Sequence, residues 1–330
     1  MKLALIFGAS SYEHEISIVS AITILNKLKN SFEIVPIFID ANRDFYLIDV
    51  QDMKSKFFAS KEYLKKAKKL ELTRSAFEAK SLFGSKRVEF DVAINLVHGR
   101  DGEDGKLAAI FEFFDINFIG PRVEGSVISY NKLFTKMFAK ELGINVIDYV
   151  VLKEDGKKEI PFDFPIIIKP LRLGSSIGVS VVKEKSELDY ALDVAFEFDS
   201  EVLVEPFIKD IKEYNLAGAK GSKWHISIVE EPKKEEFLDF DKKYLDFSRD
   251  ERVNEANISE ELKKELEAVF KKIYEPLFRG AIIRCDFFVK DNSIYLNEIN
   301  PIPGSMANYL FSDFEEVVKD VATNLHKEKD

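Results

Sequence analysis

A strand, a helix and a second strand at the start of the chain constrain the fold more than any other feature. Residues 3–7 and 33–40 are apolar enough for buried strands, and residues 17–29 between them have the periodicity of an amphipathic helix. This βαβ order indicates a parallel sheet. The sequence therefore predicts an α/β protein with an N-terminal parallel-sheet, Rossmann-like domain. The first loop lacks the G-x-G-x-x-G pattern, which disfavours a nicotinamide dehydrogenase.

Length, charge and cysteine content narrow the class of protein further. At 330 residues the chain is too long for one typical core, so we expect two or three domains. A net charge of −10 argues against nucleic acid or an anionic membrane as the main partner. The single cysteine, Cys285, excludes an intrachain disulfide, and no apolar run resembles a signal peptide or a membrane span. We therefore expect a cytoplasmic protein.

A predicted hairpin near the C-terminus carries the clearest candidate site. Residues 284–289 alternate like a strand with one buried face, and residues 294–300 form a second strand. The hairpin brings Asp286 beside Glu298, with Asn300 one step further on. Two carboxylates and an amide oxygen form a hard, all-oxygen site of the kind that Mg²⁺ takes together with phosphate oxygens.

The turn of this hairpin decides whether these side chains share a face. In a hairpin without a bulge, the residue numbers of every cross-strand pair add up to the same total. Asp286 and Glu298 point to the same face only if that total is even. A three-residue turn at 291–293 satisfies that condition, whereas a two-residue turn at 291–292 places the two carboxylates on opposite faces. An ordinary surface hairpin with solvated acids is the alternative. The Pro-Gly turn soon after Asn300 favours a site.

Loops with unusual composition follow other predicted strands. The strand at 90–97 leads into residues 98–105, which contain three glycines, and the strand at 166–169 leads into a Gly/Ser loop at 174–178. Such a loop can donate backbone N–H groups and hydroxyls to phosphates while Lys169 supplies charge. It is not a Walker A loop, because no G-K-[ST] follows. A flexible hairpin loop is the plainer interpretation.

Three further segments complete the predicted organisation. Residues 54–80 are charge-rich with a helical pattern, and residues 126–142 predict one helix that ends at Gly143. Residues 233–257 mix charges with Phe237, Phe240, Tyr244 and Phe247. Long irregular segments are more often lids or disordered than scaffold, and these aromatic residues favour a lid that docks.

Taken together, the motifs resemble the D-alanine–D-alanine ligase family of the ATP-grasp superfamily. The resemblance spans nearly the whole chain and depends on the order and approximate spacing of its motifs. They are Glu13-His14-Glu15-Ile16-Ser17, His98-Gly99, Gly102-Glu103-Asp104-Gly105, Ser129-Tyr130-Asn131-Lys132, Lys169-Pro170, Gly174-Ser175-Ser176-Ile177-Gly178, Lys243-Tyr244, Arg284-Cys285-Asp286, Glu298-Ile299-Asn300-Pro301 and Pro303-Gly304.

The resemblance implies a fold and an activity. The fold is a three-domain ATP-grasp architecture, with an N-terminal α/β substrate domain (1–121), a central ATP-grasp subdomain (122–208) and a C-terminal subdomain with the metal and substrate site (209–330). The activity is the ATP-dependent joining of two D-alanine molecules through an acyl phosphate, for peptidoglycan precursor synthesis. Two Mg²⁺ ions, replaceable by Mn²⁺, and a cytoplasmic homodimer are also implied.

The resemblance also implies roles for individual residues. Asp286, Glu298 and Asn300 would hold the metal ions, and the oxyanion hole would come from Arg284 and the Gly304 N–H. Nucleotide-binding positions would be Lys132, Lys169, Ser176, Glu205, Ile208, Glu213 and Lys243. Glu13 would receive the first substrate's ammonium with His98 nearby, and Ser175 and Tyr244 would complete a triad with Glu13. Which of these groups takes the proton from the second amine stays open.

One position departs from the family pattern. A serine–leucine pair commonly grips the second substrate's carboxylate, but here Tyr309 and Leu310 occupy that place. A phenol can also donate a hydrogen bond, although from further out. The alternatives are a ligase that makes D-alanyl-D-lactate, another ATP-grasp carboxylate–amine ligase, and a catalytically silent nucleotide-binding module. Tyr244 directly after Lys243 favours the dipeptide enzyme, and the intact hairpin residues argue against a silent module.

Overall fold

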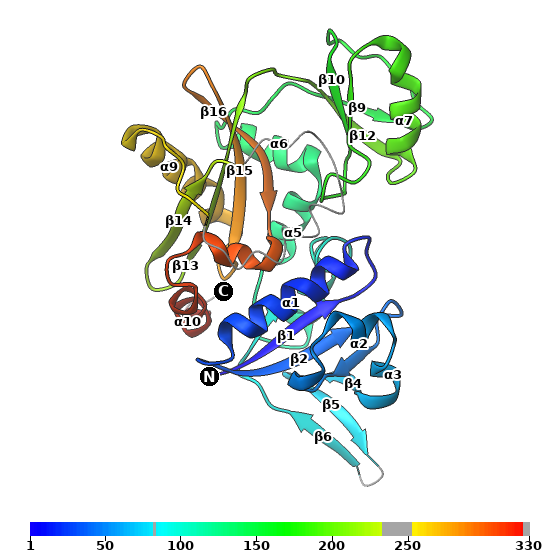
Figure 1. The fold of residues 1–330 in the computed structure, drawn as a ribbon, viewed down its shortest axis with the longest axis vertical. Coiled ribbons are helices and arrows are strands. Elements are labelled where there is room, and N and C mark those ends of the chain that lie inside the picture. Colours follow the sequence, from blue (N-terminus) through cyan, green and yellow to red (C-terminus); the bar gives the residue numbers. More distant parts are fainter. Residues whose placement is uncertain (82–83, 233–252, 326–330) are drawn as a thin grey trace.

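The structure, a computed structural model, describes residues 1–81, 84–232 and 253–325. Three β-sheets lie within these residues, each with its own helices (Figure 1). Most of the predicted lid, including Phe240, Lys243 and Tyr244, falls outside the described residues. Within them, no helix has the length and apolar character needed to cross a membrane.

The N-terminal sheet contains the predicted βαβ unit. Its strand order is β6-β5-β4-β3-β2-β1-β7-β8, and β1 pairs in parallel with both β2 and β7. Apolar residues fill these strands because both faces of a parallel sheet are covered. The elements of this unit are β1 (Lys2–Gly8), α1 (His14–Leu28), β2 (Glu33–Ile39), β3 (Phe45–Leu47), β7 (Val92–Asn95), α4 (Lys106–Phe113) and β8 (Phe118–Ile119).

The helical prediction for residues 54–80 is wrong in its second half. Only two short helices form there, and residues 68–73 and 76–81 are two strands in which buried Leu70, Phe77 and Ala79 pack into the core. Exposed lysines and glutamates alternate with these apolar residues, which is the period of a strand that covers one face of a core. The β5–β6 hairpin projects from the domain (Figure 1). The elements are η1 (Val50–Asp52), α2 (Ser55–Ala59), α3 (Tyr63–Lys66), β4 (Lys68–Thr73), β5 (Ala76–Ser81) and β6 (Gly84–Val88).

The single helix predicted for residues 126–142 is in fact two helices, α5 (Val123–Tyr130) and α6 (Lys132–Glu141). Asn131 separates them with an extended backbone, and its side chain accepts hydrogen bonds from the N–H groups of Leu133 and Phe134. Asparagine is a strong N-cap residue because it satisfies amides that lack a partner in the first turn. The break makes Lys132 the first residue of α6.

The central sheet is antiparallel, in the order β11-β10-β12-β9, with a small core of its own against α7. The first strand of this sheet in chain order, β9, begins at Val150. Asn145, five residues earlier, makes an isolated bridge to Tyr295 in the third sheet. The elements are β9 (Val150–Lys153), β10 (Ile166–Pro170), β11 (Ser180–Val182), η2 (Lys185–Glu187), α7 (Leu188–Phe196) and β12 (Glu201–Pro206).

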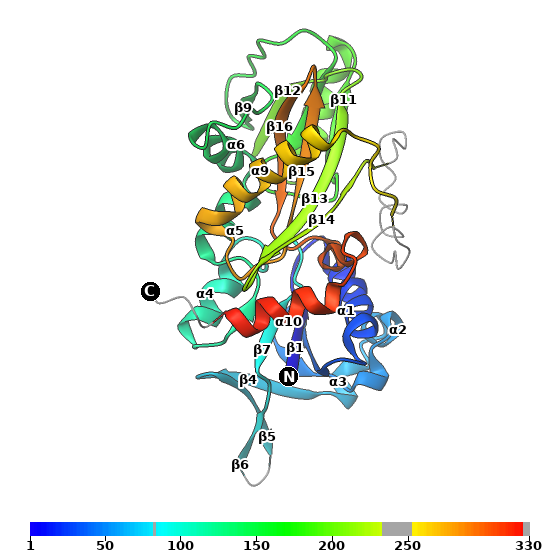
Figure 2. The same cartoon turned by 90° about the vertical axis from the view of Figure 1, so that its left-hand side faces the viewer.

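The third sheet has the order β14-β13-β15-β16 and contains the predicted hairpin of β15 and β16. The last helix, α10, lies between this sheet and the N-terminal sheet (Figure 2). Its buried valines share one core cluster with residues of β1 and β13, which fastens the C-terminal part to the N-terminal domain. The elements are β13 (Lys212–Lys220), β14 (Trp224–Glu230), α9 (Glu260–Leu277), β15 (Ile283–Lys290), β16 (Ser293–Asn300), η3 (Gly304–Leu310) and α10 (Phe314–Asn324).

Replacing Asn131 with alanine should destabilise the protein by about 1 kcal/mol, because the first amides of α6 lose their cap. Asn131→Ser keeps a capping oxygen and should cost much less. Urea denaturation at neutral pH measures both. Equal midpoints for the alanine and serine variants would contradict the capping role.

Candidate active site

The hairpin β15–β16 places Asp286 directly opposite Glu298, and Arg284 opposite Asn300. The turn has two residues, Asp291 and Asn292, because Lys290 pairs with Ser293. The three-residue turn considered from the sequence is therefore wrong. A register shift after the Asp286–Glu298 pair, where Phe287 pairs with Leu296, leaves Asn297 as an extra residue. This β-bulge reverses the parity that the short turn imposes. The carboxylates therefore share a face for a reason that differs from the predicted one.

The bulge also explains how one strand presents acids and still contributes to the core. Leu296 and Ile299 are buried at 0% and 1% exposure, although three positions separate them. In a regular strand those two side chains would point to opposite faces. That spacing is visible in the sequence and is the signal that could have predicted the bulge.

Charged groups neutralise one another across this face. Arg284 donates from Nε to Asp286 Oδ1 (2.7 Å) and from Nη2 to Oδ2 (2.9 Å), and Asn300 Nδ2 donates to the same carboxylate (2.9 Å). Lys132 Nζ donates to Glu298 Oε1 (3.0 Å). Burial raises the pKa of Glu298, but the charge and hydrogen bond of Lys132 outweigh it, so this pKa lies below its ordinary value. Glu298 is therefore ionised at neutral pH.

The hairpin face offers oxygens of the kind that a hard cation prefers. Among the described residues, no group of three or more His, Cys, Asp or Glu side chains could hold a metal ion. A cation at Asp286 and Glu298 would therefore need the Asn300 amide and oxygens from outside the protein, and phosphate is a fitting source. On this chemistry, the residues present fit Mg²⁺.

A second charged cluster lies at the end of β12. Glu205 is 2% exposed and pairs with Lys136 through Oε1 (2.5 Å) and with Lys169 through Oε2 (2.6 Å). Lys169 Nζ also lies 3.4 Å from the Asn297 side chain, on the bulge. Burial raises the pKa of Glu205, but its two lysines hold it below the ordinary value. Through Lys169, this cluster connects the central sheet to the β15–β16 hairpin.

Glu13 stands between the N-terminal domain and the Gly/Ser loop. Ser175 Oγ donates a hydrogen bond of 2.5 Å to Glu13 Oε1. A Cβ on Gly99 would lie 2.5 Å from Glu13 Oε2, and one on Gly174 would lie 3.2 Å from Oε1, so both glycines make room for this carboxylate. Burial, followed by the charge of Glu103, raises the pKa of Glu13 to about 7, although the Ser175 hydrogen bond opposes the shift.

Glu103 and His98 are the nearest ionisable neighbours of Glu13 on the N-terminal side. Glu103 Oε1 lies 3.7 Å from His98 Nδ1, and burial raises the pKa of Glu103 to about 8. Burial also lowers the pKa of His98, which favours a neutral imidazole. Glu298 raises the pKa of both Glu13 and Glu103, which indicates that these acids and the hairpin belong to one site.

The loop after β16 closes the site on the side of Arg284. Tyr309 Oη lies 3.5 Å from Arg284 Nη1 and is half-buried, while Leu310 is buried in the core below. Gly304 begins η3 and is half-buried. The phenol therefore reaches the guanidinium that also binds Asp286.

The remaining predicted residues lie on adjoining elements. Ser176 has a left-handed backbone (φ 58°) in the Gly/Ser loop, Ile208 is half-buried just beyond β12, and Glu213 pairs in register with Phe288. Lys132 Nζ makes a second hydrogen bond (2.8 Å), to the carbonyl of Leu173, the residue just before the Gly/Ser loop. The structure thus gathers residues from all three sheets.

Three polar residues that contact predicted site residues were not themselves predicted: Lys136 pairs with Glu205, Glu103 lies 3.7 Å from His98, and Ser20 Oγ lies 2.9 Å from His98 Nε2. Lys136 lies one helical turn after Lys132, so its position on the same face of α6 was a usable signal. Glu103 lies within a quoted motif but had no assigned role. Ser20 has no signal in the sequence, because a serine inside an amphipathic helix looks like any other.

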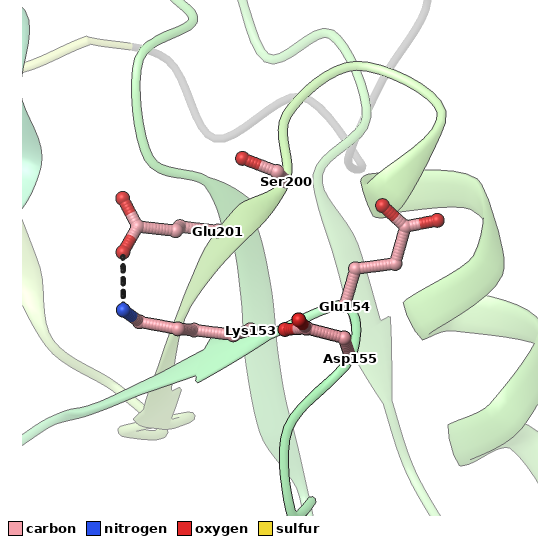
Figure 3. A pocket seen from close by; sticks show the side chains of 5 residues that line it. All are labelled: Lys153, Glu154, Asp155, Ser200 and Glu201. Carbon is pink, nitrogen blue, oxygen red and sulfur yellow. Dashed lines mark ion pairs between the residues drawn. The ribbon is translucent and has the colours of Figure 1, made fainter.

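A surface pocket at the opposite end of β12 from Glu205 plays no part in this arrangement. Lys153, Glu154, Asp155, Ser200 and Glu201 line it, and Lys153 pairs with Glu201 at 3.7 Å (Figure 3). None of these residues was predicted to bind a substrate or a nucleotide. We assign the pocket no function.

Solved structures define the class of protein. The D-Ala-D-Ala ligase structure from Helicobacter pylori shares 50% identity, with a TM-score of 0.89 and coverage of 100% of both chains. The VanG D-Ala:D-Ser ligase structure from Enterococcus faecalis shares 25% identity, with a TM-score of 0.78 and coverage of 98% of both chains. The fold is therefore the ATP-grasp architecture of the carboxylate–amine ligases, as the resemblance predicted.

Sequence comparisons define the family. Residues 2–121 match the family described as D-ala D-ala ligase N-terminus, and residues 138–322 match D-ala D-ala ligase C-terminus. A relative from Sulfurovum sp. (strain NBC37-1), named D-alanine--D-alanine ligase, is 60% identical over 329 residues, with 100% of this chain and 94% of the relative covered. The chain belongs to the D-alanine–D-alanine ligase family.

Replacing Glu13 with glutamine should stabilise the protein at alkaline pH. The pKa of Glu13 is about 7 in the folded chain against an ordinary value of 4.5, so ionising it costs the folded state free energy. This cost grows between those two pH values and is complete above about pH 7. The melting temperature of Glu13→Gln is expected to exceed that of the wild type near pH 8, with the difference vanishing below about pH 4.5. A variant less stable than the wild type near pH 8 would contradict the assigned pKa.

Proposed function

We propose that this chain joins two D-alanine molecules into D-alanyl-D-alanine and converts ATP to ADP and phosphate. One observation carries the proposal: Lys132 donates both to Glu298 on the hairpin and to the Leu173 carbonyl beside the Gly/Ser loop, whose Ser175 binds Glu13. The Gly/Ser loop proposed to bind phosphate, the hairpin face proposed to bind a cation, and the Glu13 carboxylate proposed to bind an amino acid therefore lie next to one another. The family membership and the high identity to named ligases support the same activity.

The chemistry requires activation of a carboxylate, which is a poor acyl donor. The first D-alanine's carboxylate attacks the γ-phosphorus of ATP, which forms an acyl phosphate as the bond to the bridging oxygen breaks and ADP leaves. The amine of the second D-alanine attacks the acyl carbon, and the tetrahedral intermediate expels phosphate. Positioning and charge neutralisation account for most of the catalysis in phosphoryl transfer. This demand agrees with a site that is rich in lysines and hard oxygens.

Nucleotide and metal positions follow from the family resemblance. Asp286, Glu298 and Asn300 would hold two Mg²⁺ ions, with Mn²⁺ as a substitute. When bound, the ions would neutralise negative charge on the phosphates. Lys132, Lys169 and Lys243 would contact phosphate oxygens, Ser176 would assist them from the Gly/Ser loop, and Glu205, Ile208 and Glu213 would bind the nucleoside.

Glu13 and Arg284 would act on the amino acids. Ionised Glu13 would receive the first ammonium, with His98 nearby, while Arg284 and the Gly304 N–H would stabilise the tetrahedral oxygen. Ser175 and Tyr244 would complete the triad with Glu13. Tyr309 Oη lies 3.5 Å from Arg284 Nη1, which supports a role for the phenol in binding the second substrate's carboxylate beside the oxyanion hole.

The alternative function is that of a ligase with a different second substrate, and the identity of residue 309 favours it. Tyr309 replaces the serine of the common pattern, and the similar VanG structure is named a D-Ala:D-Ser ligase. D-lactate as second substrate would yield an ester in place of a dipeptide. We favour D-alanine, because two relatives at 60% identity are named D-alanine--D-alanine ligase. Action as a cytoplasmic homodimer in peptidoglycan precursor synthesis completes the proposal.

Phosphate release tests the activity directly. With ATP and Mg²⁺, D-alanine should stimulate phosphate release and L-alanine should not, with D-alanyl-D-alanine as the product. D-serine and D-lactate as co-substrates with D-alanine test the rival. A rate of phosphate release that does not depend on D-alanine would contradict the proposal, and so would a product other than the dipeptide when D-alanine is the sole amino acid.

Glu298→Gln should reduce turnover by roughly 100-fold or more, because it removes a charge that would hold a cation against the phosphates. The fold should survive, since Lys132 can still donate to the amide oxygen. Glu261→Gln, an exposed position on α9, serves as the matched control. Turnover of Glu298→Gln equal to that of the control would remove Glu298 from the site.

A further inference from the structure

The loop after β16 has an unusual backbone. Ser305, Met306 and Ala307 have φ values of 47°, 53° and 50°, in the left-handed region that residues with a Cβ seldom adopt. All three residues are buried. Consecutive residues in this region persist only where their surroundings hold them, and such conformations cluster at functional sites.

Hydrogen bonds hold three successive peptide groups of this loop. The Ile302 carbonyl accepts from the His98 imidazole, and the Pro303 carbonyl accepts from the Met306 N–H (2.7 Å). The Ser305 N–H donates to Ser20 Oγ (3.0 Å). Each peptide from Ile302 to Ser305 therefore has one polar group anchored.

This anchoring fixes the direction of the Gly304 N–H. That N–H belongs to the same planar peptide as the Pro303 carbonyl, so the two groups point in opposite directions. Rotating this peptide would break the Met306 hydrogen bond and twist the neighbouring peptides, which His98 and Ser20 hold. Pro303 adds stiffness, because its ring fixes φ.

Ser20 is the only one of these anchors that comes from a helix of the N-terminal domain. It lies in α1 with 0% exposure, and its Oγ bridges the Ser305 N–H and His98 Nε2 (2.9 Å). One hydroxyl thus connects α1, the loop after β7 and the loop after β16. The sheet that presents Arg284 contributes no part of this bridge.

We propose that Ser20 is a positioning residue that, together with His98, keeps the Gly304 N–H directed at the oxygen of the tetrahedral intermediate. The inference rests on the proposed function, in which Gly304 and Arg284 form the oxyanion hole. Ser20 touches no substrate and acts through the Ser305 and Gly304 peptides. It therefore affects the step in which the acyl carbon becomes tetrahedral, and leaves the attack of the carboxylate on ATP nearly unchanged.

Ser20→Ala tests this division between the two steps. The step at phosphorus can be followed alone, by positional isotope exchange in ¹⁸O-labelled ATP with D-alanine, and complete turnover by dipeptide formation. We expect dipeptide formation to fall by roughly tenfold to 100-fold, since losing an oxyanion donor outright costs more than misdirecting one. The rate of exchange should stay within about twofold of the wild type.

Ser17→Ala is the matched control. Ser17 is also buried in α1 and makes two hydrogen bonds through its hydroxyl, accepting from the Gly8 N–H (2.8 Å) and donating to the Leu96 carbonyl (2.7 Å). A loss of buried helix hydroxyls alone would lower the melting temperatures of both variants without separating exchange from turnover. If Ser20→Ala does not fold, Ser20→Cys retains the volume with a weak acceptor and should show the same separation.

Three outcomes would overturn the inference. Exchange and turnover that fall together in Ser20→Ala, turnover equal to the wild type, or the same separation in Ser17→Ala would each do so. Failure of the proposed function is distinguishable, because the wild type would then show no D-alanine-dependent phosphate release, and the inference would fall with it.

Discussion

The extra residue in β16 is the constraint on which the site depends. Asn297 lets the strand bury Leu296 and Ile299 on one side and still present Glu298 and Asn300 opposite Asp286 and Arg284. A regular strand could not satisfy both demands, because its side chains alternate strictly. The core of the third sheet and the proposed cation face are thus made compatible by one local irregularity, and β-bulges commonly re-aim side chains next to active sites.

Electrostatics connects the rest of the site to this face. Glu13 and Glu103 have raised pKa values because they are buried near each other and near Glu298, whereas Glu298 stays ionised beside Lys132. The site therefore combines carboxylates that resist ionisation with one that does not. An ammonium group or a cation entering this space would relieve the repulsion. Stability and substrate binding oppose each other at Glu13, as is common where a site is built for a ligand.

Sequence patterns with one consistent period predicted the fold well. The βαβ start and the two strands of the β15–β16 hairpin are confirmed, since each depends on local alternation or helical spacing. The predictions that were wrong have local causes that could not be seen in the amino-acid composition. Lysines masked the strand period of residues 68–81, the cap at Asn131 broke an apparently continuous helix, and the bulge at Asn297 invalidated the parity argument. Ser20 could not be predicted as a partner of Ser305, because its role arises only when α1 and the loop after β16 meet.

The most direct test of the account locates the cations themselves. Crystals grown with Mn²⁺ and a non-hydrolysable ATP analogue would reveal the metal by its anomalous scattering. We predict two peaks at coordination distance from side-chain oxygens of Asp286, Glu298 and Asn300, on the face that adjoins Lys132 and Lys169. Metal bound to the nucleotide with no contact to these three residues, or bound on the opposite face of the hairpin, would contradict it.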